Sequence, residues 1–589
     1  MGRRRPGRCL PRALLAALPI LTLGLVDCYS TGSGAEPPLD RFYFPVGLQV
    51  SHGGTVLYAI NSDFDLQYNG GTLQSYDLSL IRRHTLRLIA DPRDPNVPVI
   101  QPNPDVPIPL GEIAAPPVDS TFYFRDSAVV GAFATDLVLS RPPSKLVPST
   151  PRLPGENITV GTRSFDRLFA PIRGDASLTW ASVMRDHPDF GPTADPKAYG
   201  PFKIFCGQDP VTHRCDAGHA AGKPSDPGNS RGVTMPGEPF AMAISEDGES
   251  IIVTHQNETK TSLFSTGQTI LQADPTEPNA PIEDVAPPPS IQFILDGVPF
   301  GGVGATAIPH DRDAFRESPA GFPKPGFFQT SRAIPEVALI RAYSDAFGGT
   351  ASSLRRPFLD REGVFPVGVG AGGTDSRGIV IDPTPRIACK AKVAPADPLA
   401  GRTQVDVDRD IVRCARRPAR AFIANRTPAS LLVGEVGGSA NDLDAYDPDR
   451  LILHTSIPLS NGPSKLYLAP VVEPDGAYGL RVFAVCFDSA TVFVFDPETM
   501  TLENVIRVGL GPFAMAFDPF DLEDVALHRQ VPMDPREAGT GLRRYRFAYV
   551  ASFTNSFVQV IDLDNARANR ATYERVVFTL GQPSAPKGT

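Results

Sequence analysis

Four residues in one Pro-rich stretch have the side chains needed to bind zinc or to form a disulfide: Cys206, His213, Cys215 and His219. Thiolates and imidazoles are the usual ligands of structural zinc. However, His213 and Cys215 are only two positions apart, and the spacing matches no zinc module. The eight residues between Cys206 and Cys215 include glycine and proline, enough to turn the chain and close a small ring. We therefore predict a Cys206–Cys215 disulfide, with a zinc site or two unpaired thiols as the alternatives.

Two further cysteines, Cys389 and Cys414, flank a long insertion. The segments on either side of it are expected to be antiparallel strands, so the two ends of the insertion must come together. A disulfide there would fix the insertion at its base, and export to an oxidising compartment permits such a bond. We predict this pair as well, which leaves Cys486, inside an apolar strand, as a buried and unreactive thiol.

Other residues of catalytic type lie in less informative surroundings. Gly228–Gly232 reads Gly-Asn-Ser-Arg-Gly, the pattern of serine hydrolases, but that motif needs a strand–turn–helix elbow and no helix is expected here. His255 ends an apolar strand and could face a channel, although a histidine bonded within the core is the commoner case. Asp63 and Asp65 could bind a cation, although acidic turn residues usually cap turns. The sequence therefore assigns no catalytic residue, no metal ligand and no cofactor.

The N-terminus is typical of an exported protein. Five arginines within the first twelve residues precede an apolar stretch, Ala13–Val26. This stretch is too short to span a bilayer as a finished helix, so a secretion signal is the better interpretation. We predict a signal peptide over residues 1–27.

The apolar stretch ends in Leu25-Val26-Asp27-Cys28. This sequence resembles a bacterial lipobox, whose cysteine becomes the lipidated first residue of the mature protein. Leu25 and Cys28 fit the pattern, whereas Asp27 stands where glycine or alanine is usual. We predict a lipid on Cys28, followed by a tether over residues 28–40 that contributes nothing to the core. Cleavage after Ala35, which would release a freely secreted protein, is the alternative.

The composition favours a folded, acidic protein. Of 589 residues, 41% are hydrophobic and 21% are charged, which is enough apolar material for a packed core. The formal net charge is −9, and removal of residues 1–27 takes away five arginines and one aspartate, which makes it −13. An acidic surface repels phosphate backbones, and no basic stripe with interleaved aromatic residues is present. Nucleic acid is therefore not an expected partner.

The positions of the prolines indicate the fold class. The chain has 62 prolines, many of them in clusters, and proline breaks both helices and inner strands. The clusters therefore indicate long loops between short strands. Because long amphipathic helical windows are nearly absent, we predict an all-β protein.

A repeated pentapeptide reveals the organisation of these strands. Pro-Phe-Ala-Met-Ala occurs at Pro239–Ala243 and again at Pro512–Ala516. A glycine lies one or two residues before each copy, and each copy starts a series of turn, strand, turn, strand. Weaker copies of the same series bring the number of units to seven, opening near residues 45, 128, 239, 303, 375, 463 and 512.

Repeats of short antiparallel strands at such spacing are typical of a β-propeller. The strands are apolar on both faces, as expected when each sheet lies between two neighbours. We predict one seven-bladed propeller over residues 41–589, with long Pro-rich insertions at residues 184–234 and 383–418. Both pentapeptides should form innermost strands, and Val576–Leu580 should close the ring as an outer strand of the blade beside the N-terminal one, or within that first blade. An array of β-sandwiches is the rival fold.

One stretch carries a resemblance to a known family. Ala548–Leu563 reads Ala-Tyr-Val-Ala-Ser-Phe-Thr-Asn-Ser-Phe-Val-Gln-Val-Ile-Asp-Leu, which is similar to the YVTN-type β-propeller repeat. With its lipobox-like start, the chain resembles propeller lipoproteins of myxobacteria over most of residues 41–580. The resemblance implies a propeller in the cell envelope, and it implies no catalytic residues.

These observations favour a lipoprotein of the cell envelope, held at a membrane (the outer membrane by expectation) through Cys28. A periplasmic or secreted protein is the alternative. We expect the propeller to act as a rigid platform whose long loops bind a protein or a surface glycan. The rival hypothesis is a lactonase-like or dehydrogenase-like enzyme with a site at the central channel, because the fold does not decide between the two.

Overall fold

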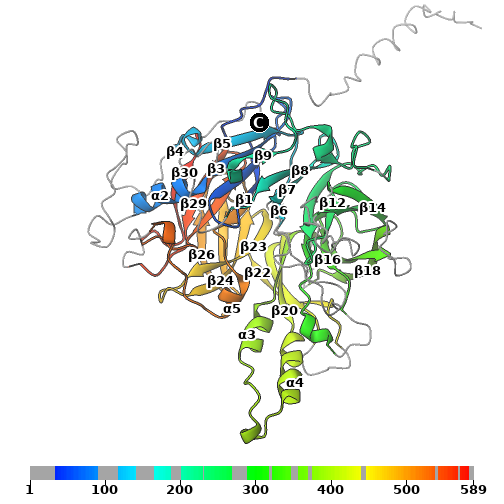
Figure 1. Cartoon of the computed structure of the whole chain (residues 1–589), viewed down its shortest axis with the longest axis vertical. Helices are drawn as coiled ribbons and strands as arrows, with labels where there is room; N and C mark the ends of the chain where they lie inside the picture. The colour runs from blue at the N-terminus through cyan, green and yellow to red at the C-terminus, as the bar shows by residue number, and fades with distance from the viewer. Residues whose placement is uncertain are drawn as a thin grey trace, which may run out of the picture.

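Seven small antiparallel sheets form a ring in the computed structural model, so the predicted seven-bladed β-propeller is confirmed (Figure 1). The structure describes residues 34–89, 117–140, 165–186, 200–229, 231–267, 288–316, 322–345, 356–368, 374–438, 446–537, 541–567 and 571–582. We number the blades 1 to 7 in chain order and name their strands below, from the innermost outward. Within the described residues, no helix has the length and apolar character needed to cross a membrane.

The strands are distributed evenly over the seven blades. Blade 1 contains β1 (Pro45–Val50), β2 (Val56–Asn61), β3 (Thr72–Asp77) and β5 (Phe124–Val129). Blade 2 contains β6 (Val138–Ser140), β7 (Phe165–Ile172) and β8 (Ser177–Met184), with β9 (Ile204–Phe205) and β10 (Ala220–Ala221) both paired to β8. Blade 3 contains β11 (Pro239–Ile244), β12 (Ser250–His255), β13 (Lys260–Ser265) and β14 (Ser290–Asp296). Blades 4 and 5 contain β15 (Gly302–Ala307), β16 (Gly326–Ser331), β17 (Glu336–Asp345) and β18 (Arg356–Pro366); and β19 (Thr374–Asp382), β20 (Ala419–Thr427), β21 (Ala429–Val436) and β22 (Leu451–Pro458). Blades 6 and 7 contain β23 (Pro463–Val472), β24 (Tyr478–Cys486), β25 (Thr491–Asp496) and β26 (Thr501–Arg507); and β27 (Pro512–Phe517), β28 (Phe547–Ser552), β29 (Phe557–Asp562) and β30 (Arg575–Leu580), with the short β4 (Pro117–Val118) outside β30.

Both pentapeptides form innermost strands, β11 and β27, as predicted. In six of the seven innermost strands the register with the second strand shifts near the first residues, which marks a β-bulge that increases the local twist. Small residues are needed there because neighbouring blades converge. A Cβ atom on Gly304 would lie 2.1 Å from the carbonyl oxygen of Arg377 in blade 5, and one on Gly47 would lie 2.5 Å from the Cβ of Leu137.

The core consists of seven apolar clusters, one between each pair of neighbouring blades. Strand β28 shows why its sequence is apolar on both faces. Tyr549 and Ala551 pack toward blade 1, whereas Ala548 and Val550 pack toward blade 6. Alternate residues of a strand point to opposite faces of its sheet, so a strand covered on both sides needs apolar residues throughout.

The ring closes where blade 7 meets blade 1. Strand β30 is the fourth strand of blade 7, and β4, from the first quarter of the chain, pairs with it in parallel. The first of the two predicted forms of closure is therefore correct.

The predicted start of the second unit near residue 128 is wrong, because residues 124–129 form the last strand of blade 1 and the innermost strand of blade 2 begins at Val138. The loop signals between those strands are too weak to fix that boundary.

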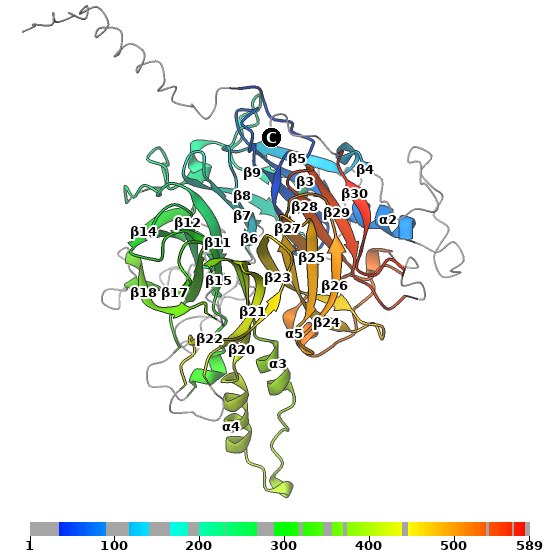
Figure 2. The ribbon, with the colours of Figure 1, turned by 180° about the vertical axis from the view of Figure 1, so that it is seen from behind.

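Two helical segments differ from the expected loops. Helix α2 (Leu78–Ile89) connects β3 to β5. The insertion at 383–418 folds as a hairpin of α3 (Thr384–Ala391) and α4 (Gln404–Ala415), which stands out from the ring in both views (Figures 1 and 2). Its second helix begins with a capping box in which the Thr403 hydroxyl accepts from the Asp406 amide and the Asp406 carboxylate accepts from the Thr403 amide. The prolines at 395 and 398 lie between the two helices. Because clusters of proline indicate loops, the number of prolines in this insertion gave no sign of the hairpin.

We define the top face of the ring as the side on which the innermost strands begin and the bottom face as the side on which they end. The described part of the expected tether lies on the top face. Ala35 forms a bridge with Tyr68 of blade 1, and the Gln74 side-chain amide donates to the carbonyl of Leu39 at 2.8 Å. The described part of the expected tether therefore makes hydrogen bonds with blade 1, which the sequence did not predict. Residues 1–33, which include the predicted signal peptide and Cys28, lie outside the described residues.

Candidate functional site

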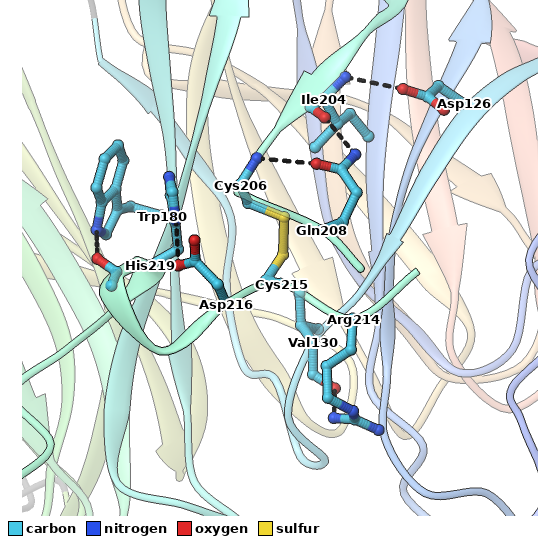
Figure 3. The surroundings of a disulfide bond; sticks show 11 residues. Asp126, Val130, Trp180, Ile204, Cys206, Gln208, Arg214, Cys215, Asp216 and His219 are labelled. Atoms are coloured by element: carbon cyan, nitrogen blue, oxygen red, sulfur yellow. Dashed lines mark hydrogen bonds and ion pairs between the residues drawn. A yellow bond between two sulfur atoms is a disulfide. The ribbon is translucent and has the colours of Figure 1, made fainter. Parts of the chain in front are cut away.

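Both predicted cysteine pairs are disulfide-bonded. The Cα atoms are 5.1 Å apart in Cys206–Cys215 and 5.4 Å apart in Cys389–Cys414, within the range that a disulfide requires. The first closes a small loop beside blade 1 (Figure 3), and the Cys215 amide donates to the Val129 carbonyl at 3.0 Å. The second joins α3 to α4 near the base of the hairpin, as the spacing of the cysteines suggested.

The zinc alternative is excluded because the two sulfur atoms of Cys206 and Cys215 are bonded to each other. His219 instead lies 2.8 Å from an Asp216 carboxylate oxygen and packs on Trp180 (Figure 3). No group of three or more potential metal ligands occurs within the described part of the chain. Cys486 is the buried free thiol, as predicted, and burial raises its pKa to about 12.

The remaining candidates from the sequence have structural surroundings. His255 is fully buried, and its ring nitrogens lie 2.8 Å from the Gly237 carbonyl and 2.8 Å from the Ser262 hydroxyl. Burial lowers its pKa to about 4, so the ring is neutral. The serine of the Gly-x-Ser-x-Gly pattern, Ser230, lies outside the described residues. The adjacent Asn229 lies in a turn and donates to the Val233 carbonyl at 2.8 Å.

Asp63 and Asp65 lie in the turn between β2 and β3 on the top face. Asp63 is 1% exposed. One of its oxygens accepts from the Tyr68 amide at 3.2 Å, and the other has no hydrogen-bond partner in the structure. Burial raises the pKa of Asp63 to about 7, against the effect of that amide and with a small contribution from Asp65. Asp65 accepts a hydrogen bond from the Tyr43 hydroxyl. Asp63 is therefore the buried member of the pair and Asp65 the half-buried one, and no third acidic, histidine or cysteine ligand completes a cation site among the described residues.

This burial makes a pH prediction. A carboxyl whose pKa is raised by folding favours the folded state most at low pH, and that contribution is lost as the pH rises through about 7. We expect Asp63→Asn to raise the stability at pH 8 by about 1 kcal/mol or more and to have little effect near pH 4. Thermal melts at pH 4, 6 and 8 measure this change. The exposed Asp360→Asn is the control, and an equal response of both variants would contradict the prediction.

One cavity near the central channel opens on the bottom face, with a volume of about 540 Å³. It lies where β1, β23 and β27 end, so blades 1, 6 and 7 form its walls. Aromatic and polar side chains share the lining: Gln49, His52, Tyr467, Tyr478, Phe517, Phe520, Asp521, Asp524, Arg536 and Arg544.

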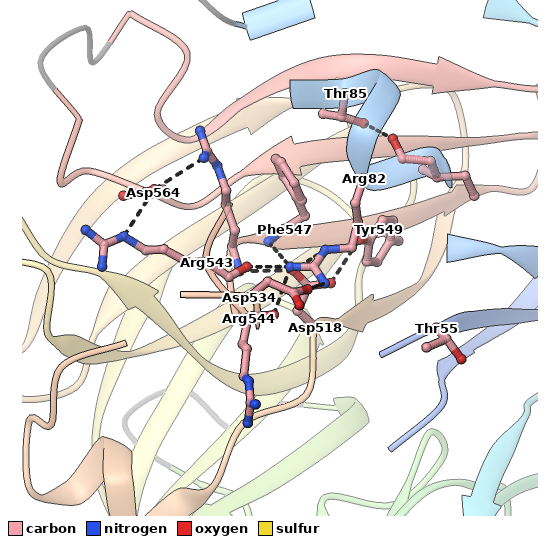
Figure 4. Close-up of polar contacts among 12 residues, drawn as sticks. Thr55, Arg82, Thr85, Asp518, Asp534, Arg543, Arg544, Phe547, Tyr549 and Asp564 are labelled. Atoms are coloured by element: carbon pink, nitrogen blue, oxygen red, sulfur yellow. Dashed lines mark hydrogen bonds and ion pairs between the residues drawn. The ribbon is translucent and has the colours of Figure 1, made fainter. Parts of the chain in front are cut away.

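A buried ion-pair network forms the wall of this cavity beside blade 1 (Figure 4). Arg82 of α2 is 1% exposed and lies 3.5 Å from a carboxylate oxygen of Asp518 and 3.3 Å from one of Asp534. Asp518 also accepts from the Tyr549 hydroxyl at 2.9 Å and from two backbone amides at 3.0 Å. Burial raises the pKa of Asp518, although Arg82 opposes the shift. Burial opposes ionisation of Asp534 as well, but its interactions with Arg536 and Arg82 are stronger and lower the pKa of Asp534.

The helical hairpin stands next to this cavity. Helix α5 (Leu522–Ala526) follows the cavity-lining Asp521, whose side chain accepts from the Glu523 amide and caps the helix. Helix α3 of the hairpin packs against α5. The cavity and the disulfide-linked hairpin therefore belong to one surface, although the hairpin comes from blade 5 and the cavity from blades 1, 6 and 7.

A smaller, apolar cavity of about 180 Å³ opens at the channel on the top face. Six phenylalanines line it, from turns between second and third strands, from the starts of innermost strands and from the loop between blades 1 and 2. We call it the phenylalanine cup: Phe64, Phe133, Phe240, Phe487, Phe513 and Phe553. Below it, Lys465 of blade 6 lies 2.8 Å from Asp136, which precedes β6 of blade 2, and 4.8 Å from the ring centre of Phe513. Blades 6 and 2 are not neighbours, so this ion pair crosses the channel.

Sequence reasoning found the disulfides but neither cavity. Phe513 is part of the second pentapeptide, and Phe553 lies in the stretch that resembles the YVTN repeat, so both were noted only as strand and turn residues. A signal was present: phenylalanine recurs in equivalent turns, as Phe64 in blade 1, Phe487 in blade 6 and Phe553 in blade 7. Aligning the units on their second turns would have placed these rings together.

No protein-family model matches the chain, and no curated protein matches it. Among solved structures it is similar to the hydrazine synthase of Kuenenia stuttgartiensis, with 10% identity and a TM-score of 0.39 over 91% of this chain and 100% of that chain. It is similar to a putative 6-phosphogluconolactonase of Bacteroides fragilis, with 12% identity and a TM-score of 0.36 over 80% and 86% of the two chains. A periplasmic gluconolactonase of Pseudomonas aeruginosa has 12% identity and a TM-score of 0.35 over 79% and 86%.

Proposed function

We propose that the protein is an envelope-anchored propeller of the YVTN type that serves as a binding platform, and that its bottom cavity holds a sugar unit of a surface glycan. The cavity itself is the observation that carries this proposal. Its volume of about 540 Å³ falls within the range of small-ligand sites, about 300–1,000 Å³. The phenylalanine cup, at about 180 Å³, is below that range.

The lining of the cavity supports a neutral ligand with both polar and apolar faces. The lining contains three arginines and three aspartates, Arg82, Arg536, Arg544, Asp518, Asp521 and Asp524, so neither an anion nor a cation is favoured by the formal charge. The half-buried rings of Tyr467 and Phe520 offer flat apolar surfaces between these polar groups, and tyrosine adds a hydroxyl to its apolar ring. A sugar presents hydroxyls at its edge and C–H groups on its faces, which matches this lining.

An array of immobilised neutral oligosaccharides tests the proposal with the purified chain from residue 36 onward. We expect retention on a restricted set of sugars, and binding to none of them would contradict the glycan assignment. The enzyme hypothesis makes a different prediction for the same cavity. Mass spectrometry of the bound sugars after incubation would then reveal a changed mass, whereas a binding platform returns them unaltered.

The proposed anchor is a lipid on Cys28, which would hold the protein at a membrane of the envelope, the outer membrane by expectation. The basic start, the apolar stretch and the lipobox-like sequence support it. The two disulfides indicate an extracytoplasmic protein, which agrees with export. Each buried CH₂ of an acyl chain adds about 0.8 kcal/mol, so several chains on one cysteine give lasting attachment.

We expect Cys28→Ala to move the protein from the membrane fraction to the soluble fraction and to leave its melting temperature unchanged, because every described strand lies C-terminal to that residue. Fractionation followed by mass spectrometry of the mature N-terminus measures both processing and lipidation. Asp27 is the residue that could redirect cleavage. A mature chain that begins at Glu36, or one with an unmodified Cys28, would contradict the anchor.

A further inference from the structure

The top face carries exposed apolar side chains on four separate loops. Phe64 is 47% exposed, Val211 83%, Phe300 39% and Leu510 57%. Phe64 lies between the second and third strands of blade 1, and Phe300 and Leu510 lie just before the innermost strands of blades 4 and 7, so all three are at the top by definition. The phenylalanine cup lies in the same face at the channel.

The loop of Val211 reaches the same face through the disulfide-closed loop. The His213 carbonyl accepts from the amide of Val129, the last residue of β5, at 2.8 Å. Arg214 donates to the backbone carbonyl of Asn69 at 2.9 Å, and Asn69 lies in the top-face turn of blade 1. The Cys206–Cys215 disulfide therefore holds Val211 at the rim of the top face.

The N-terminal segment is attached to this face as well. The Asn69 amide donates to the Ala35 carbonyl at 2.9 Å, and the Asn69 side chain donates to Glu36 at 3.0 Å. Six residue steps separate Gly34 from Cys28, and an extended chain spans at most about 3.6 Å per residue, or roughly 20 Å here. A lipid on Cys28 would thus keep the top face within that distance of the bilayer.

We propose that the top face is a membrane-contacting surface, in which Phe64, Val211, Phe300 and Leu510 enter the boundary between lipid headgroups and acyl chains while the phenylalanine cup faces the bilayer. This inference rests on the proposed anchor at Cys28. Apolar residues on a surface that is held close to a bilayer leave water by entering that boundary, as monotopic proteins do.

The charges on this face are compatible with a zwitterionic membrane. Arg173 pairs with Glu238, and Arg426 pairs with Asp488, so these rim charges cancel within each pair. These two pairs add no net positive charge that would attract anionic lipids, and we assign the contact to the apolar side chains. The orientation has a consequence for the platform, because the bottom cavity and the helical hairpin then face away from the membrane, where a glycan or other ligand can reach them.

Tryptophan quenching tests the orientation. The chain from Cys28 onward is coupled through that thiol to a maleimide-bearing lipid in phosphatidylcholine vesicles, since the other free thiol, Cys486, is buried. The native protein has one tryptophan, Trp180. Leu510→Trp adds a second one on the top face, and Leu399→Trp adds a second one on the hairpin, where Leu399 is 100% exposed. Val211→Trp is a second top-face variant.

With brominated acyl chains, the emission added by Leu510→Trp and by Val211→Trp should fall at least about twofold, whereas that of Leu399→Trp should not change. Equal quenching of all three variants would overturn the proposal. Absence of quenching at the two top-face positions would also overturn it, and this is the result expected if the top face binds a protein partner instead. Chemical coupling does not depend on natural processing. A mature protein without the lipid would therefore contradict the anchor while leaving the measured orientation intact.

Discussion

Replacing Arg82 by methionine is expected to lower the free energy of unfolding by about 3–5 kcal/mol, the usual cost of removing one partner from a buried ion pair. Arg82 connects α2 of blade 1 to Asp518 and Asp534, which lie between the first two strands of blade 7. Without it, Asp518 loses its buried counter-ion (Figure 4). Because burial already raises the pKa of Asp518, the loss of stability should be greater at pH 8 than at pH 5.

Arg529→Met is the matched control for this experiment. Arg529 also forms two ion pairs, at 3.0 Å with Glu523 and 2.6 Å with Asp524, but its side chain is 52% exposed. Exposed pairs contribute about 0–1 kcal/mol, so this variant should unfold close to the wild type. Guanidinium denaturation compares the two, and equal midpoints for Arg82→Met and Arg529→Met would contradict the role of the buried network.

Ending the chain after Glu574 is expected to destabilise the same junction between the first and last blades by roughly 5 kcal/mol or more. The truncation removes β30, in which Val577, Phe578 and Leu580 are at most 6% exposed, and each such side chain contributes about 1.5–3 kcal/mol when buried. It also leaves β29 as an unpaired edge and removes the partner of β4. An exposed edge strand invites pairing with other chains.

Denaturation and size-exclusion chromatography measure the two effects of the truncation, lower stability and self-association. A chain that ends after Gln582 is the control, since it keeps every described strand. Monomeric protein with an unchanged midpoint after the Glu574 truncation would mean that β30 does not close the ring.

The ring could be predicted from the sequence because each blade repeats the same local requirements. The pentapeptide at Pro239 and Pro512 meets three of them at once: a turn before the strand, a small residue at the bulge and apolar residues on both faces. The disulfides followed from the same order of strands, since residues that flank an insertion between antiparallel strands must meet. Both inferences use residues that are close along the chain.

The two cavities could not be predicted in the same way. The phenylalanine cup joins Phe64 to Phe553, and the ion-pair network joins Arg82 to Asp518, so each depends on how the first and last blades meet. The phenylalanine that recurs after the second strand of several blades was the one local signal for the cup, and no local pattern marks the ion-pair network. The hairpin was missed for a different reason, because its capping box and apolar positions are confined to two short helices between prolines.

Calorimetric titration with an oligosaccharide retained by the array tests most directly that the bottom cavity is the binding site. Phe520→Ala removes a half-buried ring from that cavity, and Phe487→Ala removes a half-buried ring from the phenylalanine cup on the opposite face. The account predicts at least about a tenfold loss of affinity, or roughly 1.4 kcal/mol, for Phe520→Ala and an unchanged affinity for Phe487→Ala. Unchanged binding by Phe520→Ala, or loss of binding by Phe487→Ala, would contradict it.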